Sequence, residues 1–276
     1  MTGGGDFVGA LQAAAARSRF MSKLAVKLKG QCDSVIGRRL SSGIDLRHNG
    51  EGWLADRIAP DALIFADVGA NLGAWSLYFA KRMARANGIL LEPAPKTVAR
   101  LREVIASEQL VGLEIIAAAA GDQAAHATFC AEPGFGETSS LVKGHSLEVA
   151  ELVTVPVVTL DQVLHERGIE TLDMLKIDAE GYDLRVIFGA RKYVARQAIK
   201  VIQFEYNAPW VAAGSTLTAA YGLLEQNGYT VRVLQKNGLW RFDPVKVGEF
   251  YRYANFVAWC PGPHAEKLDG DHASLI

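Results

Sequence analysis

From Leu63 to Trp259, short apolar segments alternate with longer segments whose apolar residues recur every three or four positions. The short segments are expected to be strands, and they lie at 63–67, 88–91, 113–118, 174–177, 201–204, 229–234 and 255–259. The longer segments are expected to be helices, and they lie at 73–86, 95–106, 161–167, 182–193 and 217–226. Parallel strands need long crossover connections, which α-helices usually provide. The alternation therefore predicts an α/β fold, with a mostly parallel sheet and helices on both faces.

The composition suits one large domain and excludes several other classes of protein. The chain has 276 residues, of which half are hydrophobic, and 29 basic residues nearly balance 30 acidic ones. Strong binding to nucleic acid is not expected, because such proteins carry a marked basic excess. Three scattered cysteines without a C-x-x-C pair do not predict a zinc site or a disulfide framework. No apolar run approaches the roughly 20 residues that cross a bilayer, so a cytoplasmic enzyme is expected.

The N-terminal segment differs from the rest of the chain in charge. Residues 1–40 contain seven basic and two acidic residues, a formal charge of +5. Apolar residues from Phe7 to Leu28 recur every three or four positions, which predicts a helix with one apolar face. Such a helix either caps the main domain or meets an anionic surface or partner. We expect a basic helical cap at 1–45, a main domain at 46–260 and a polar tail at 261–276.

One long segment interrupts the alternation of strands and helices. Residues 132–152 are rich in Gly, Ser and Thr and contain few large apolar residues. A long insertion inside a compact domain is usually functional or disordered. We therefore expect a substrate loop here. It contains His145, whose ordinary pKa would suit a general base.

The segment from Asp67 to Gly73 reads D-V-G-A-N-L-G and joins the first strand to its helix. Glycines let the backbone approach a ligand closely, and the helix start offers unpaired N–H groups. A nicotinamide dinucleotide is disfavoured, because the central Gly of G-x-G-x-x-G is missing and Asp67 would repel a pyrophosphate. A cationic ligand, such as the aminoacyl sulfonium of S-adenosylmethionine, would tolerate Asp67 well. A tight turn without a ligand is the alternative.

Further carboxylates follow the ends of three other predicted strands. Glu92 ends the second strand, where a Rossmann-like fold binds ribose hydroxyls, or else it complements the dipole of the next helix. Asp178 and Glu180 follow the fourth strand, and Glu205 ends the fifth. The first two are either helix-capping acids or ligand-facing groups in the crevice. Such acids divide base and ligand-holding roles or bind a divalent metal. No metal is expected, because no His or D-x-D cluster accompanies them.

In this order and spacing, the motifs resemble the FkbM-type family of S-adenosylmethionine-dependent methyltransferases. The match is to its D-x-G-A-N-x-G opening, its K-I-D-x-E-G block and its F-E-Y strand end, and it covers roughly residues 46–259. The resemblance implies a Rossmann-like class I methyltransferase fold, with a seven-stranded sheet whose last strand is antiparallel. It also implies S-adenosyl-L-methionine as cofactor and O-methylation of a hydroxyl on a sugar or secondary-metabolite acceptor.

Carried onto this chain, the resemblance implies roles for individual residues. The cofactor-binding residues would be Asp67, Gly69, Ala70, Asn71, Gly73, Glu92, Pro93, Ala120, Asp122 and Asp178. Asp178 is the first candidate for the general base, because the rigid end of a strand can hold geometry and accept a proton. Glu205 is the second candidate and His145 the third.

Two other functions stay open on the sequence. One is a non-catalytic module that binds an adenosyl ligand, since no unambiguous catalytic His–Asp pair is present. The other is a nicotinamide-dependent reductase. The expected partner is a small-molecule or glycan acceptor, without nucleic acid or a transmembrane segment. The sequence leaves open N-methylation and assembly into a homo-oligomer.

Overall fold

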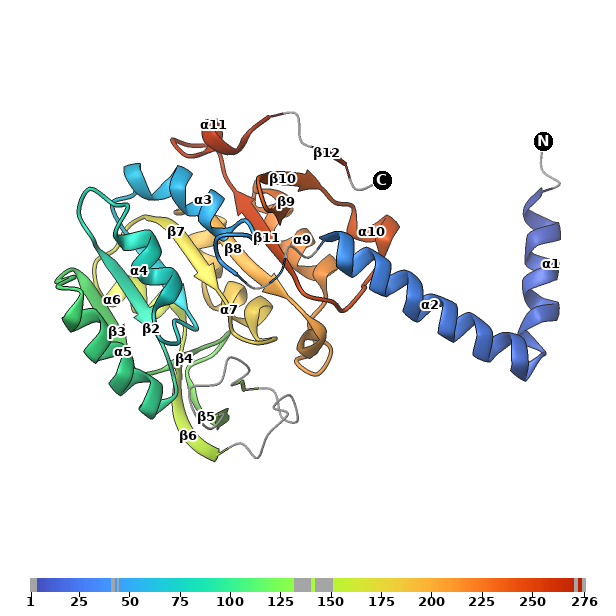
Figure 1. The fold of residues 1–276 in the computed structure, drawn as a ribbon, viewed down its shortest axis with the longest axis horizontal. Helices are drawn as coiled ribbons and strands as arrows, with labels where there is room; N and C mark the ends of the chain where they lie inside the picture. Colours follow the sequence, from blue (N-terminus) through green and yellow to red (C-terminus); the bar gives the residue numbers. More distant parts are fainter. Residues whose placement is uncertain are drawn as a thin grey trace.

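The computed structural model describes residues 4–40, 43, 45–131, 140–141, 151–270 and 273–274. A nine-stranded sheet forms its centre (Figure 1). In spatial order the strands are β12 (Ala273–Ser274), β10 (Gly238–Arg241), β9 (Thr230–Gln235), β11 (Ala254–Trp259), β8 (Ile199–Tyr206), β7 (Leu172–Ile177), β1 (Phe65–Val68), β2 (Gly88–Leu91) and β3 (Leu113–Ile116).

The five strands from β8 to β3 are mutually parallel. Strand β11 lies between β8 and β9 and is antiparallel to both. The predicted fold class is thereby confirmed, including the antiparallel last strand of the seven that were predicted. The sheet is larger than expected, because β10 pairs antiparallel with β9 and β12 pairs with β10 at the same edge.

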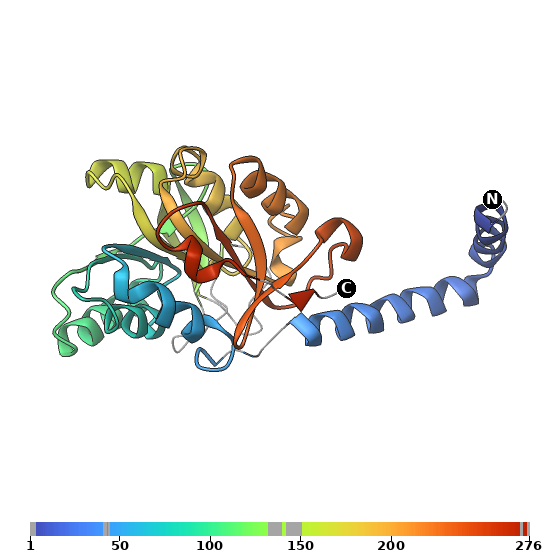
Figure 2. The same cartoon turned by 90° about the horizontal axis from the view of Figure 1, so that it is seen from above.

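Helices cover both faces of the sheet (Figures 1 and 2). One core packs α3 (Glu51–Ile58), α4 (Ala74–Ala80), α5 (Pro95–Ser107) and α11 (Ala265–Leu268) on one face. The other packs α6 (Leu160–Glu166), α7 (Asp183–Gly189), α8 (Arg191–Ala195) and α9 (Leu217–Gln226) on the opposite face. Alternate strand residues supply the two cores: Phe65 belongs to the first and Ala66 to the second. This follows from the two-residue period of a strand.

Local sequence explains where several helices begin. Pro95 opens α5, a position where the missing N–H costs nothing. Thr159 and Thr216 cap α6 and α9, each accepting a backbone N–H at 3.2 Å. The predicted helix at 182–193 is in fact two helices, α7 and α8, which meet at Ala190.

A second, three-stranded sheet was not predicted. It consists of β4 (Ala119–Ala120), β6 (Glu151–Val158) and β5 (Ala125–Ala131), in that spatial order. Strand β5 pairs antiparallel with β6, although the expected substrate loop separates them in the sequence. Of that loop, the described residues are Ser140, Leu141, Glu151 and Leu152, and the other residues of 132–152 lie outside the described structure.

The N-terminal segment forms two helices, α1 (Gly4–Ala16) and α2 (Arg19–Leu40), where one was expected. Figure 2 shows both extending away from the sheet. The end of α2 contacts the body, where Leu40 is buried and its carbonyl accepts a hydrogen bond from Gln235 at 2.6 Å. Among the described residues, neither these helices nor any other is both long and apolar enough to cross a membrane.

Short elements complete the chain. They are η1 (Ala59–Asp61), η2 (Ala208–Trp210) and α10 (Pro244–Val247). The polar tail packs on the body through α11, whose Leu268 is buried. Buried His264 precedes this helix, and its Nε2 lies 3.1 Å from Asp173 Oδ1.

Candidate active site

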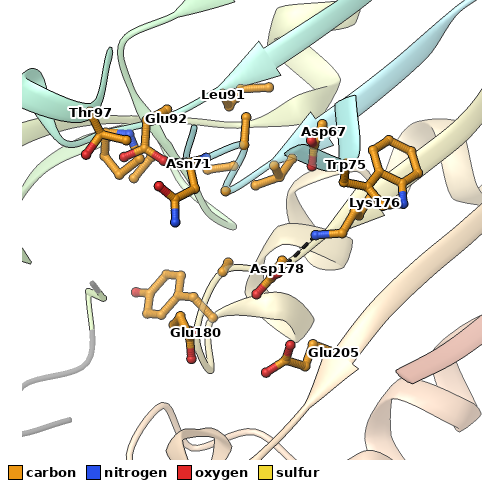
Figure 3. A pocket seen from close by; sticks show the side chains of 18 of the residues that line it. Asp67, Asn71, Trp75, Leu91, Glu92, Thr97, Lys176, Asp178, Glu180 and Glu205 are labelled. Carbon is orange, nitrogen blue, oxygen red and sulfur yellow. Dashed lines mark hydrogen bonds and ion pairs between the residues drawn. The ribbon is translucent and has the colours of Figure 1, made fainter. Parts of the chain in front are cut away.

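A cavity of about 570 Å³ opens at the carboxyl ends of β1, β2, β7 and β8 (Figure 3). The strand order reverses between β1 and β7, and ligands of open α/β sheets bind at such a switch point. Its lining includes these residues predicted from the sequence: Asp67, Gly69, Ala70, Asn71, Glu92, Pro93, Ala120, Asp178 and Glu205. The strand-end carboxylates therefore meet in one cavity.

Two other predicted residues lie outside the cavity lining, and a third is not described by the structure. Gly73 lies outside the lining and is the N-cap residue of α4, with φ of 82°, and a Cβ added there would lie 2.7 Å from Leu101 Cδ1. Asp122 also lies outside it, and its carboxylate is paired with Arg185 at 2.8 Å. His145 lies outside the described residues.

The glycine turn after β1 is held tightly against the end of β7. Gly69 has φ of 82°, and an added Cβ would lie 1.9 Å from the carbonyl oxygen of Asp178. The amide of Asp178 donates to the carbonyl of Val68 at 2.9 Å. Only glycine fits this position, because any side chain would collide with the backbone of the neighbouring strand.

Glu92 is both a cavity residue and a support for the glycine turn. Its two carboxylate oxygens accept the backbone N–H groups of Asn71 at 3.0 Å and Ala94 at 2.8 Å. The side chain is only 5% exposed, and this burial raises its pKa to about 7 despite the two hydrogen bonds. A carboxylate offers about four acceptor positions, so two stay available for ligand hydroxyls.

Asp67 carries an oxygen that lacks a protein partner. It is 1% exposed, and its Oδ2 accepts the hydroxyl hydrogen of Ser76 at 2.5 Å. Burial raises its pKa to about 6, and the charge of Lys176 partly opposes this. Its Oδ1 and the Oδ1 of Asn71 have no hydrogen-bond partner within the described part of the chain. Buried acceptors left unpaired in a cavity wall suit a ligand with N–H, O–H or cationic groups.

Lys176 is the one basic residue among the described cavity-lining residues. It is 5% exposed, and its Nζ lies 3.0 Å from Asp178 Oδ2. Burial lowers the pKa of this ammonium, but the charges of Asp178 and Asp67 outweigh burial and hold it well above its ordinary value. The structure thus pairs Lys176 with the acid two residues further along the chain.

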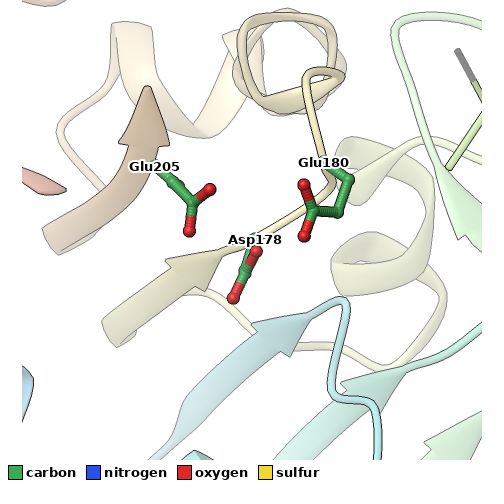
Figure 4. A group of neighbouring side chains, drawn as sticks. All are labelled: Asp178, Glu180 and Glu205. Atoms are coloured by element: carbon green, nitrogen blue, oxygen red, sulfur yellow. The ribbon is translucent and has the colours of Figure 1, made fainter. Parts of the chain in front are cut away.

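Three carboxylates of the cavity lining converge beside the ends of β7 and β8 (Figure 4). One oxygen each from Asp178, Glu180 and Glu205 can be chosen such that all three lie within 4.8 Å of one another. Asn207 Nδ2 bridges two of these groups, donating to Glu180 at 3.2 Å and Glu205 at 2.7 Å. Burial and the neighbouring negative charges raise the pKa of Glu180 to about 9 and that of Glu205 well above its ordinary value.

Another part of the cavity lining is less polar. Its walls include the residues Pro93, Ala118, Ala119, Ala120, Phe129 and Leu141. Ser140, which precedes Leu141 in the chain, is bound to the turn that contains Glu180. Its hydroxyl donates a hydrogen bond to the carbonyl of Glu180 at 2.7 Å. The cavity thus offers a small apolar slot beside a polar, acidic floor, a combination typical of small-molecule sites.

Several residues of the site were not predicted. Glu51 of α3 lines the cavity and accepts a hydrogen bond from the buried Gln203 at 2.5 Å. Asp183 holds the backbone at Glu205 in place, because its Oδ1 accepts the amide N–H of Glu205 at 3.1 Å. Asn207 did carry a signal, since residues two apart on an extended segment point to the same side and Glu205 precedes it by two. Glu51 carried none, because α3 was not predicted.

Two curated proteins are similar to parts of this chain. The chain is 25% identical over 212 residues to the AMB antimetabolite synthetase AmbE of Pseudomonas aeruginosa, covering 64% of this chain and 10% of that protein. It is 26% identical over 158 residues to the methyltransferase sdnD of Sordaria araneosa, covering 47% of this chain and 61% of that protein. It thus spans a tenth of the first relative and three fifths of the second.

Among solved structures, a precorrin-6y C5,15-methyltransferase from Geobacter metallireducens has a TM-score of 0.46 to this chain at 16% identity. That alignment covers 80% of this chain and 91% of the other. The family model described as the methyltransferase FkbM domain matches residues 67–231, from Asp67 within β1 into β9. Because this match spans more than half of the chain, the chain belongs to the FkbM methyltransferase domain family.

Proposed function

We propose that this chain is an S-adenosyl-L-methionine-dependent O-methyltransferase whose acceptor is a hydroxyl of a sugar or secondary metabolite. The observation that carries the proposal is the meeting of Asp67, Glu92, Asp178 and Glu205 in one cavity at the switch point of the sheet. Four strand ends supply them, so the rigid sheet fixes their spacing. Membership of the FkbM methyltransferase domain family supports methyl transfer as the reaction.

The residues present fit this cofactor. The unpaired Oδ1 of Asp67 would accept from the cationic aminoacyl part, and the spare acceptor positions of Glu92 would accept the ribose hydroxyls. The apolar slot beside Ala120 and Phe129 would hold the adenine ring. When bound, the cofactor supplies a methyl group already activated on a positively charged sulfur.

The chain's own residues would then position the acceptor and remove a proton. Asp178 lies within the cavity on the rigid end of β7, and Lys176 holds its Oδ2 (Figure 3). This carboxylate would accept the proton of the acceptor hydroxyl, a contribution typically worth about 10²–10⁴ in rate. Glu205, one strand away, would orient the acceptor through a hydrogen bond. Alignment of the acceptor oxygen with the methyl group would supply the remaining rate enhancement, because in-line transfer depends on positioning.

The remaining sequence-based roles belong to the same proposal. Residues 46–260 would form the methyltransferase domain and residues 1–45 its basic cap. The segment 132–152 would cover the acceptor, with His145 as an alternative base. These roles rest on the sequence, since most of that segment lies outside the described residues.

The test measures binding and transfer separately. Calorimetry with S-adenosylhomocysteine should show one site per chain, and radiolabelled methyl transfer should follow for a member of a panel of hydroxyl acceptors. Asp178→Asn should retain binding and lose transfer. The control is Glu170→Gln, which removes an exposed carboxylate paired with Arg196 on the surface. Absence of adenosyl-ligand binding refutes the proposal, and transfer to amine acceptors alone refutes its O-methylation part.

A further inference from the structure

Helix α2 presents large apolar side chains to solvent, although it extends away from the sheet (Figure 2). Residues three, four or seven positions apart lie on the same side of a helix. Five exposed apolar residues of α2 share one side in this way, with exposed fractions from 38% to 72%, and we call them the apolar stripe: Phe20, Met21, Leu24, Leu28 and Val35. Water-exposed apolar residues gathered on one side indicate a contact surface.

The rest of α2 is basic. The helix contains six basic residues and one acidic residue. Lys23 and Lys27 lie along one margin of the apolar stripe, and Lys29 lies beyond the other margin, paired with Asp33 at 2.6 Å. The stems of such lysines cover apolar surface while their ammonium groups reach outward. Phe and Leu on one side and lysines on the other are typical of helices that lie in a membrane interface.

The end of α2 nearest the body is held in place. Gly37 packs so closely on Arg252 that an added Cβ would lie 2.5 Å from the Arg252 Cβ. The guanidinium of Arg39 lies over the ring of Trp240 in β10, 4.2 Å from its centroid. The helix therefore starts from a fixed base on the body, and its apolar stripe is left open to an external partner.

We infer that the apolar stripe and the neighbouring lysines of α2 dock this protein on a membrane surface that contains anionic phospholipid. Each Lys or Arg near such a surface contributes about fivefold to binding. The whole chain has a formal charge of −1, so its net charge does not attract it to an anionic surface. Binding would therefore depend on this segment.

The charges and the arrangement of the helices favour a lipid surface over a protein partner. Pairing of two copies through the apolar stripe would bring the lysines of one α2 beside those of the other, and like charges repel. Helix α1 also exposes Phe7 and Leu11, and it runs in a different direction from α2 (Figure 1). A groove fitted to one straight helix would leave the other uncovered, whereas a membrane surface has room for both.

The experiment mixes the full chain with vesicles and measures the fraction that sediments with them. One set of vesicles contains phosphatidylserine and phosphatidylcholine in equal parts, and the other contains phosphatidylcholine alone. We expect binding to the first set, weaker binding to the second, and a loss of binding as salt is added, because salt screens exposed charges. Equal binding to both sets, or binding to neither, would overturn the inference.

Two substitutions in the same helix test the apolar stripe. Leu28→Gln removes a stripe residue, and Val26→Gln removes an apolar residue that is 74% exposed on the other side of α2. Leu28→Gln should weaken vesicle binding about tenfold or more, because the burial of a leucine is lost. Val26→Gln should keep the wild-type affinity. Equal affinities of the two variants would overturn the inference.

A pair of double variants tests the lysines. Lys23→Gln with Lys27→Gln should weaken binding to the anionic vesicles about 30-fold. The control is Lys81→Gln with Lys96→Gln, which removes two exposed lysines of the body and should leave binding unchanged. A loss of the same size in both double variants would assign the binding to overall charge and overturn the inference.

Cys32 provides a readout that needs no substitution in the apolar stripe. It is exposed, whereas Cys130 and Cys260 are buried, so a thiol-reactive dye labels it selectively. It lies one helical turn after Leu28, next to the stripe. The emission of a polarity-sensitive dye at Cys32 should shift to the blue when anionic vesicles are added. An unchanged spectrum would contradict docking through this face.

The same preparations distinguish the other possible partners. If the chain binds no vesicles and sedimentation velocity shows a dimer that Leu28→Gln dissociates, the stripe pairs two copies and the inference is wrong. If the chain binds polyglutamate and no vesicles, an acidic protein is the partner and the inference is again wrong. Vesicle binding by a monomer that Leu28→Gln weakens supports the membrane surface.

Discussion

Replacement of Lys176 by methionine should expose how the acidic cavity is kept stable. The two side chains are similar in length, so Lys176→Met removes the charge and keeps most of the packing. In the native protein Nζ lies 3.0 Å from Asp178 and faces the charges of Asp67 and Glu51. The variant would leave these carboxylates without a counter-charge among the described lining residues.

The size of the effect follows from burial. Removing one partner of a buried ion pair typically costs about 3–5 kcal/mol, because the other charge stays buried and uncompensated. Here the Asp178 side chain is one third exposed, so the buried carboxylate that would lose its counter-charge is Asp67, which is 1% exposed. For a chain of this length, about 1 kcal/mol corresponds to a change of roughly 2–4 °C in melting temperature. The melting temperature of Lys176→Met should therefore fall by about 6–20 °C at pH 8.

The loss of stability of Lys176→Met relative to the wild type should depend on pH. Burial raises the pKa of Asp67 to about 6 even though Lys176 opposes it, and removing Lys176 raises it further. An unfolded Asp ionises near 3.9. The folded variant therefore holds its proton where the unfolded chain has lost it, and its stability decreases as the pH rises from about 4 through the folded pKa. The deficit should be complete at pH 8 and small at pH 4.5.

The assay is unfolding followed by circular dichroism, in EDTA, at pH 4.5 and pH 8. Lys81→Met is the control, because Lys81 pairs with Glu108 at 2.8 Å on the surface, where both side chains are at least one third exposed. Such a pair contributes about 0–1 kcal/mol. An equal deficit for Lys176→Met at both pH values would refute the electrostatic explanation and assign the loss to packing.

Three further outcomes are expected. Gly69→Ala should lower the free energy of unfolding by at least about 2 kcal/mol in urea titration, because its Cβ would lie 1.9 Å from the carbonyl of Asp178; wild-type stability would show that the turn can shift. Glu92→Ala should weaken S-adenosylhomocysteine binding by about 1.5–3 kcal/mol in calorimetry, and an unchanged Kd would remove Glu92 from the cofactor site. Asp178→Asn should lower turnover at saturating cofactor by about 10²–10⁴, whereas undiminished turnover would assign the base elsewhere.

Much of the fold was predictable from local patterns. The strand at 88–91 and the helix at 217–226 were predicted to the residue, because each element's apolar period and boundary residues are encoded within it. The sequence also placed Asp67, Glu92, Asp178 and Glu205 near one another, since parallel strands bring their carboxyl ends to one edge. That inference needs strand order and direction but no side-chain detail.

Only the tertiary structure decided how the cavity is completed. Glu51 enters it from a helix more than a hundred residues away from Asp178 in the chain, and no local pattern records that proximity. Lys176 pairs with Asp178 rather than Glu180, because partner choice depends on where β7 and the following turn direct each side chain. The sequence by itself therefore determined the helices and strands, and the edge of the sheet at which the candidate site residues lie. The packing of distant elements determined which charges face one another there, because electrostatic interactions depend on distance in space and not along the chain.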